Sequence, residues 1–142
     1  MAKKYAIVGV GSRSRMYSKA LLDKYAGHSK LVAVCDRNPG RLNLALSKCT
    51  EAGAETKGYP AGEFEKMIRE TQPDTVIVTT VDRYHDDYIC KAMEMGCDTI
   101  TEKPMTISEQ KCQRIIDTCR KTRRDCRVTF NYRYSPPRTQ IK

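Results

Sequence analysis

Short apolar runs alternate along the chain with segments in which apolar residues recur every three or four positions. The runs at residues 5–10, 31–35 and 75–79 are nearly uninterrupted, which is typical of strands buried on both faces of a parallel sheet. Weaker strand signals lie at residues 54–57, 98–101 and 127–132. The pattern therefore predicts six strands separated by helices.

The intervening segments have the spacing of amphipathic helices. One helix is expected to begin at Asn38-Pro39, since Asn is a favoured cap and Pro fits the first helical turn. Others are expected over residues 63–71, up to a stop at Gly96, and after a capping box at Thr106-Ile-Ser-Glu109. The residues expected to face the core are Tyr17, Ala20 and Leu21; Leu42, Ala45, Leu46 and Cys49; Phe64, Met67 and Ile68; Ile89, Ala92 and Met93; and Cys112, Ile115, Ile116 and Cys119.

This order of elements predicts the fold. Strands that alternate with helices through right-handed crossovers indicate an α/β architecture with a doubly wound parallel sheet, the Rossmann fold. We expect one such domain over residues 1–131. Residues 132–142 contain two prolines and few apolar side chains, so we expect a linker that leaves the domain.

Composition narrows the class of protein. A chain of 142 residues with 39% hydrophobic residues suits a single domain with its own core. The mean hydropathy is −0.62, and no run approaches the roughly 18 apolar residues that a membrane helix requires. The first residues do not form the apolar leader of a secreted protein. We therefore expect a cytoplasmic protein without a membrane partner.

The net charge of +9 is concentrated in the last third of the chain. Residues 111–142 hold ten Lys and Arg but only two acidic residues, so this segment alone carries 10 − 2 = +8. A nucleic-acid surface is one interpretation. Since the chain contains no nucleic-acid-binding motif, we favour a solvated helix face beside a site for an anionic ligand, and no nucleic-acid partner.

Seven cysteines are present, at positions 35, 49, 90, 97, 112, 119 and 126. No two have the CxxC spacing of a zinc site, and neither histidine extends a pair into a metal-binding pattern. The odd number also disfavours a disulfide framework. We expect reduced thiols that fill the core, and no metal site.

The sharpest chemical signal is Gly9-Val-Gly11-Ser-Arg-Ser14, between a predicted strand and a predicted helix. The first glycine permits a tight turn, and the second lets the backbone approach a pyrophosphate, which free N–H groups and the helix dipole favour. Ser14 stands where Gly or Ala is usual, and its small side chain still allows close packing. The predicted pyrophosphate-binding residues are Gly9, Gly11, Ser12, Arg13, Ser14 and Arg15.

Asp36 ends the second predicted strand, 25 positions after Gly11. A carboxylate there can accept hydrogen bonds from the ribose of adenosine and would repel a 2′-phosphate, which favours NAD over NADP. Arg37 favours NADP instead, because a guanidinium can pair with that phosphate. We therefore expect NAD as the cofactor, with NADP as the alternative. The structural alternative for Asp36 is a carboxylate that only forms a turn.

Two further clusters follow predicted strands, where the carboxyl edge of an open α/β sheet holds ligands. Thr79, Thr80 and Asp82 are candidates for the nicotinamide ribose, and His85 is either a further cofactor contact or a core histidine. Glu102-Lys103-Pro104 follows the fifth strand. A lysine there can orient a hydroxyl or assist proton transfer, and a cis bond before Pro104 would hold the turn. Lys103 is the predicted catalytic residue.

Gly9-x-Gly11, Cys35-Asp36-Arg37-Asn38-Pro39, Thr79-Thr80-x-Asp82-x-x-His85, Glu102-Lys103-Pro104 and Asn131-Tyr-Arg133-Tyr-Ser-Pro136 together resemble the N-terminal half of the glucose–fructose oxidoreductase/inositol dehydrogenase (Gfo/Idh/MocA) family. The resemblance implies NAD(P)-dependent oxidation of a sugar, polyol or related hydroxyl compound. It also implies that Glu102 and Lys103 lie beside the nicotinamide, and that the full-length protein is a homo-oligomer. Val81 departs from the family pattern, where proline is common.

The resemblance also implies a second α/β domain that supplies most of the substrate pocket, and we expect this domain to be missing from the chain. We expect that the chain is the front part of a longer enzyme and is itself inactive. Three alternatives stay open: an NAD-dependent glycoside hydrolase of the same family, a non-catalytic nucleotide-binding module, and a methyltransferase, which Glu102-Lys103-Pro104 disfavours.

Overall fold

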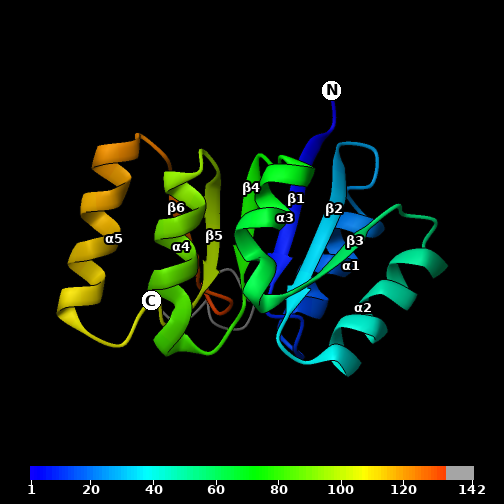
Figure 1. Ribbon diagram of the computed structural model, residues 1–142, viewed down its shortest axis with the longest axis horizontal. Helices are drawn as coiled ribbons and strands as arrows, with labels where there is room; N and C mark the ends of the chain where they lie inside the picture. The colour runs from blue at the N-terminus through cyan, green and yellow to red at the C-terminus, as the bar shows by residue number, and fades with distance from the viewer. Residues whose placement is uncertain (134–142) are drawn as a thin grey trace.

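A computed structural model describes residues 1–133 of the chain, and its framework is one six-stranded sheet in the order β3-β2-β1-β4-β5-β6 (Figure 1). All neighbouring strands are parallel, so their carboxyl ends share one edge, the lower edge in Figure 1. The expected Rossmann fold is confirmed. The strands are β1 (Lys3–Val8), β2 (Ser29–Asp36), β3 (Lys57–Pro60), β4 (Thr75–Val78), β5 (Asp98–Glu102) and β6 (Cys126–Thr129).

Helices cover both faces of the sheet, and α3 and α4 lie in front of it in Figure 1 while α1 lies behind. The α-helices are α1 (Ser14–Leu22), α2 (Pro39–Glu51), α3 (Phe64–Thr71), α4 (His85–Glu94) and α5 (Glu109–Thr122). Two short 3₁₀ turns, η1 (Ala61–Glu63) and η2 (Asp82–Tyr84), lead into α3 and α4. The helix expected over residues 63–71 therefore begins as a 3₁₀ turn, at Ala61.

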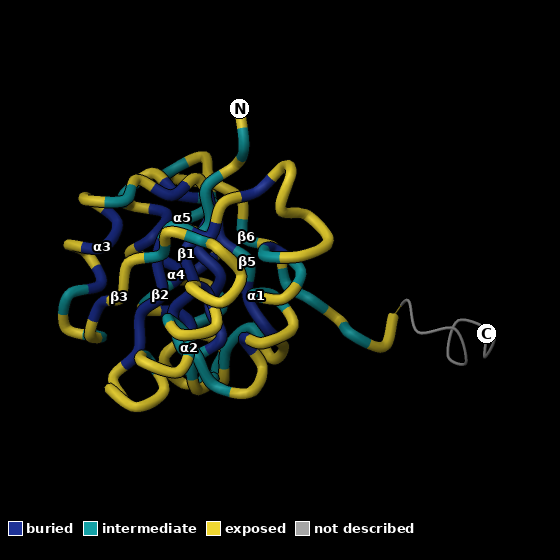
Figure 2. The backbone as a smooth tube through the Cα atoms, turned by 90° about the vertical axis from the view of Figure 1, so that its right-hand side faces the viewer, coloured by how far each residue is buried: buried dark blue, intermediate teal, exposed yellow. Residues whose placement is uncertain are grey.

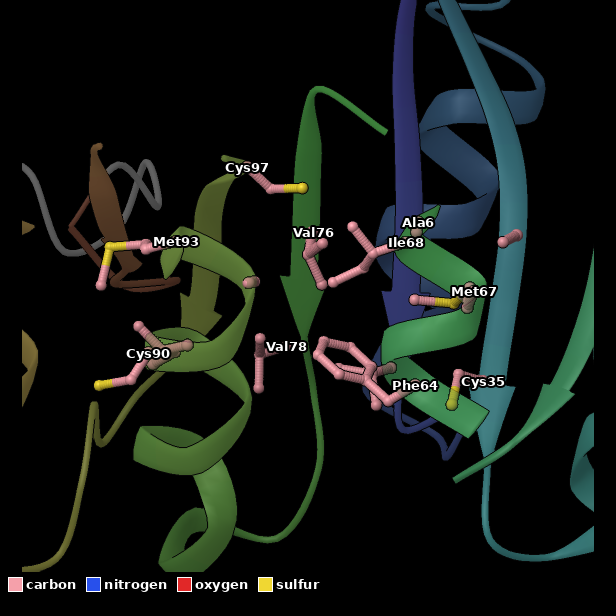
Figure 3. Close-up of a cluster of buried hydrophobic side chains, with 14 of the residues drawn as sticks. Ala6, Cys35, Phe64, Met67, Ile68, Val76, Val78, Cys90, Met93 and Cys97 are labelled. Atoms are coloured by element: carbon pink, nitrogen blue, oxygen red, sulfur yellow. The ribbon is translucent and has the colours of Figure 1, made fainter. Parts of the chain in front are cut away.

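Burial is concentrated in the central strands, while the helices turn exposed faces outward (Figure 2). One core cluster packs α3, α4 and α5 against the sheet, with Phe64 facing Val78, Ile68 facing Val76 and Met67 over β1 (Figure 3). A second, smaller cluster lies under α1 and α2 and centres on Ile7, Val34 and Ile77. The residues predicted for the core faces of α3 and α4 are buried, which confirms those two stripes. In α5 only Ile115 of the four predicted residues is buried, and Ile116 is exposed.

Local capping explains where two helices begin. The Asn38 side chain accepts a hydrogen bond from the Arg41 backbone N–H, with Pro39 in the first helical position, as expected. The capping box predicted at Thr106 is wrong. The α5 cap is Ser108, whose hydroxyl accepts from the Lys111 N–H over 3.3 Å. Thr106 lies two residues before this cap, so its hydroxyl does not reach the first-turn N–H groups.

The observed strand boundaries differ most from the predicted ones where the sequence signal is weakest. β3 is not at residues 54–57 but begins at Lys57 and ends at Pro60. Gly58 and Pro60 are poor strand formers, so the sequence pattern did not predict a strand at these residues. A Cβ at Gly58 would lie 2.6 Å from the end of the Leu46 side chain of α2, so a larger residue there would require Leu46 to shift. β6 ends at Thr129 rather than residue 132, and most of the linker expected over 132–142 lies outside the described residues.

The seven cysteine thiols are free, and four of them have the buried core position that was expected. Cys35, Cys49, Cys90 and Cys97 are buried, and Cys112, Cys119 and Cys126 are half-buried. Burial raises the pKa of the Cys35 thiol to about 12 and that of Cys97 to about 11. These thiols therefore act as small apolar groups at neutral pH.

Candidate functional site at the carboxyl edge of the sheet

The turn after β1 is built around Gly9, whose φ of +86° lies in the left-handed region that favours glycine. Its N–H donates to the Cys35 carbonyl, and its carbonyl accepts from the Thr79 hydroxyl at 2.7 Å. A Cβ at Gly9 would lie 2.7 Å from both the Thr79 carbonyl carbon and the Thr80 nitrogen. Only glycine fits here, because the loop after β4 passes directly against the turn.

Gly11 differs, because a Cβ on it would meet nothing within 4 Å. It therefore borders open space rather than protein. The Ser14 hydroxyl donates to the Gly11 carbonyl at 2.7 Å and is buried at the start of α1. The serine in the third motif position thus closes the turn onto the helix instead of blocking the space beside Gly11.

Asp36 holds this turn from the neighbouring strand. Its carboxylate accepts from the Val10 N–H and from the Asn38 N–H, each at 2.7 Å, and the residue is 7% exposed. The two bonds fix the carboxylate between the glycine turn and the start of α2. Asp36 therefore does act as a turn-forming acid, which was the structural alternative to a ribose-binding role. Each oxygen of the Asp36 carboxylate can still accept a further hydrogen bond, since each has a second lone pair.

A cavity of about 630 Å³ opens beside these residues, which is in the size range of small-molecule and cofactor sites. Its walls combine the glycine turn with the loops after β2 and β4, and with the facing sides of α1 and α2. The predicted site residues that line it are Gly9, Gly11, Ser12, Arg13, Ser14, Arg15, Asp36, Arg37, Thr79 and Thr80. Asp82, His85, Glu102 and Lys103 are not among its lining residues.

His85 is the first residue of α4 and is fully buried. Its Nε2 lies 3.0 Å from the Thr80 carbonyl and its Nδ1 lies 3.1 Å from the Pro104 carbonyl. The ring therefore joins the loop after β4 to the loop after β5. Having no exposed surface, the side chain has the core position that was the alternative to a cofactor contact.

Glu102 is also buried, and it meets a residue that the sequence pattern assigned only to packing. Tyr17 of α1 donates its hydroxyl to Glu102 Oε1 at 2.9 Å and lies 2.6 Å from the Thr129 hydroxyl. The other carboxylate oxygen pairs with Arg13 Nε at 3.7 Å. Burial, the largest cause, raises the pKa of Tyr17 to about 12. This network ties α1 to the ends of β5 and β6.

Lys103 lies between these two anchors and is itself exposed. The side chain of the preceding Glu102 is held by Tyr17, and the carbonyl of the following Pro104 faces His85. The Lys103–Pro104 peptide bond is cis, as the sequence analysis anticipated. The lysine is thus fixed at its backbone while its ammonium reaches solvent at the carboxyl edge.

Several cavity residues were missed by the sequence analysis. Tyr84 and Tyr88 line it from η2 and α4, and Arg41 and Lys48 from α2. The two cations are the last members of a basic wall that also includes Arg13, Arg15 and Arg37. A helical-wheel projection of α2 would have placed Arg41 and Lys48 on one side, since they are seven positions apart.

The described residues contain no group of three or more His, Cys, Asp and Glu side chains that could hold a metal ion. Over the same part of the chain, no helix combines the length and apolar character needed to cross a bilayer.

A parallel doubly wound sheet with a glycine turn, a cavity at its carboxyl edge and an acid at the end of β2 defines a dinucleotide-binding class of domain. Residues 3–130 match the family model described as an oxidoreductase family with an NAD-binding Rossmann fold. The chain belongs to this family, Gfo/Idh/MocA. The methyltransferase alternative is thereby set aside.

Individual relatives agree with this assignment. The Bacillus subtilis protein YteT is 33% identical over 141 residues, 99% of this chain and 33% of its own length. Inositol 2-dehydrogenase of Salmonella typhimurium is 29% identical, over 100% of this chain and 41% of its own. The WlbA dehydrogenase of Chromobacterium violaceum, crystallised with NADH and UDP-GlcNAcA, superposes with a TM-score of 0.84 at 26% identity, covering 99% of this chain and 39% of that one. The chain thus spans about a third to two fifths of these relatives.

Proposed function

We propose that this chain is the cofactor-binding domain of an NAD-dependent oxidoreductase that acts on a sugar, polyol or related hydroxyl compound. The observation that carries the proposal is the pair of glycines in the turn after β1. Gly9 is forced by the backbone of Thr79 and Thr80, whereas Gly11 borders open space at the cavity. Inositol 2-dehydrogenase among the relatives, and WlbA dehydrogenase with its nucleotide sugar, support the substrate class.

The residues present fit a dinucleotide. The loop from Gly9 to Arg15 leads into the N-terminus of α1, where N–H groups and the helix dipole favour a pyrophosphate. Asp36 lines the cavity with free acceptor capacity for ribose hydroxyls, and Arg37 stands beside it. Thr79 and Thr80 line the cavity on its β4 side. The proposed cofactor is NAD, with NADP admitted by the basic wall.

In this proposal Lys103 is the catalytic residue beside the reacting end of the cofactor, and Asp82 and Glu102 flank that end. Bound nicotinamide would supply a hydride acceptor. The lysine would orient the substrate hydroxyl and help move its proton, and the buried Glu102 would hold the loop that carries it. The whole protein is proposed to bring the remaining substrate contacts from the region beyond this chain, and to be a homo-oligomer.

Calorimetry with NAD, NADP and S-adenosylmethionine tests the cofactor assignment. We expect saturable binding of NAD, weaker binding of NADP and no binding of S-adenosylmethionine. A Gly11→Leu variant should fold and lose NAD binding, because its side chain enters the open space beside the turn. A folded parent chain that binds neither dinucleotide would overturn the proposal.

A second candidate is supported by one class of relative. Glycosyl hydrolase family 109 protein 2 of Akkermansia muciniphila is 27% identical over 134 residues, 91% of this chain and 28% of its own length. The same cofactor site would then serve glycoside cleavage rather than net oxidation. Sugar release by the longer protein without accumulation of NADH would favour this candidate, and stoichiometric NADH would exclude it.

A further inference from the structure

His85 is buried and does not line the cavity, yet its ring contacts two of the loops at the carboxyl edge of the sheet. It begins α4, it is 0% exposed, and each ring nitrogen faces a backbone carbonyl. A neutral imidazole carries one ring N–H, so the ring donates a hydrogen bond to one of the two carbonyls and packs against the other. The Thr101 hydroxyl is a third neighbour, 3.4 Å from Nδ1.

The two carbonyls belong to different loops at the carboxyl edge of the sheet. Thr80 follows β4, and its nitrogen and the Thr79 carbonyl group approach the glycine turn so closely that Gly9 cannot carry a side chain. Pro104 follows β5 and comes directly after Lys103. Because the imidazole ring is rigid, its two nitrogens fix the separation of these loops. A chain of contacts therefore runs from the Gly9 backbone through the Thr80 backbone and the His85 ring to the Pro104 carbonyl.

We propose that His85 is a positioning residue that sets Lys103 relative to the glycine turn, and that it does so through the Thr80 and Pro104 carbonyls without touching the cofactor. The inference rests on the proposed function, in which Lys103 serves the nicotinamide end. It assigns the histidine a role that neither its burial nor its place on α4 would reveal. Loss of the ring should release the Lys103 loop and leave the cavity around the glycine turn intact.

Two ligands separate this role from a general effect on folding. ADP-ribose contains adenosine, the pyrophosphate and the second ribose, whereas NADH adds the nicotinamide ring. We expect His85→Phe, which keeps an aromatic ring but removes both nitrogens, to bind ADP-ribose within about twofold of the parent and NADH about tenfold more weakly. The control is His28→Phe, since His28 is exposed; its affinity for both ligands should match that of the parent. Equal weakening of both ligands by His85→Phe would overturn the positioning role.

A double-mutant cycle tests whether His85 acts through the lysine. Lys103→Met should weaken NADH binding by a similar factor, and the double variant should be no weaker than the weaker single variant. Multiplicative losses would show that the two residues act independently and would also overturn the proposal. If the parent chain binds ADP-ribose but gains nothing with NADH, the proposed role of Lys103 fails instead. If it binds neither ligand, the proposed function fails.

A measurement on the unmodified chain covers the case in which His85→Phe does not fold. The buried, hydrogen-bonded ring N–H of His85 should give an imidazole proton resonance that persists at neutral pH, while that of exposed His28 is lost to exchange with water. Absence of a protected His85 resonance would contradict a hydrogen bond from the ring to either carbonyl.

Discussion

The hydroxyl of Tyr17 donates a hydrogen bond of 2.9 Å to Oε1 of Glu102, although 85 positions separate the two residues. The bond links the helix after the glycine turn to the strand that ends just before Lys103. Because Glu102 is 4% exposed, its carboxylate depends on protein groups in place of water. Tyr17 therefore contributes to the same edge of the sheet as the glycine turn itself.

Removing that hydroxyl should destabilise the fold. Tyr17→Phe leaves the buried Glu102 with the Thr129 hydroxyl and the looser Arg13 pair, so we expect the free energy of unfolding to fall by about 1–3 kcal/mol. Urea denaturation measures it. Tyr25→Phe is the matched control, because Tyr25 is 47% exposed, and should change stability by less than about 0.5 kcal/mol. Equal effects of the two substitutions would show that the Glu102 network does not stabilise the chain.

The same residue gives a pH dependence of known sign. The pKa of Tyr17 is raised from 10.0 to about 12, and burial of the hydroxyl is the largest cause. A group whose pKa is higher in the folded chain than in the unfolded chain stabilises the fold below the unfolded value. That contribution is lost as the pH rises from 10.0 to about 12. The parent should therefore lose stability more steeply than Tyr17→Phe across this interval, measured by urea midpoints at each pH, and parallel curves would contradict it.

The sequence predicted those parts of the fold that depend on local chemistry. Asn38 and Pro39 begin α2 because capping involves residues three positions apart. The α5 cap shows the limit of local signals, since Thr106 and Ser108 are both good caps and only the path of the chain selects Ser108. Tyr17 and the Thr80–His85–Pro104 contacts were out of reach, because a pattern shows a tyrosine or histidine on a helix but not the distant atom that it meets.

The two glycines of the turn should separate stability from binding. Gly9→Ala forces a side chain into the left-handed region and against the Thr79–Thr80 backbone, so we expect it to cost about 3 kcal/mol of stability. Gly11→Ala meets nothing within 4 Å and should leave stability within about 0.5 kcal/mol, while NAD affinity falls. Thermal unfolding and calorimetry on both variants provide the comparison. Similar stability losses would mean that the Gly9 contact is not what demands glycine.

Cysteine reactivity should follow burial. Because the pKa values of Cys35 and Cys97 are raised to about 12 and about 11, almost none of either thiol is ionised near neutral pH. Iodoacetamide at about pH 8 should therefore modify the half-buried Cys112 first and the four buried thiols only after urea is added. Peptide mass spectrometry identifies the sites. Rapid alkylation of Cys35 in the folded chain would contradict its buried place in β2.

Asp86 and Asp87 offer the sharpest test of how burial governs an ion pair, because both contact Arg114 from neighbouring positions. Asp86 is 2% exposed on its side chain and also pairs with Lys111 at 2.6 Å, whereas the Asp87 side chain is 53% exposed. Asp86→Ala leaves two cations at the α4–α5 interface without their buried partner and should cost about 3 kcal/mol of stability. Asp87→Ala should cost less than about 1 kcal/mol. Adding about 1 M NaCl should remove the smaller effect, since exposed pairs are screened, and leave most of the larger one. Urea denaturation of both variants at two salt concentrations measures this, and equal, equally salt-sensitive losses would show that the Asp86 cluster behaves as a surface pair.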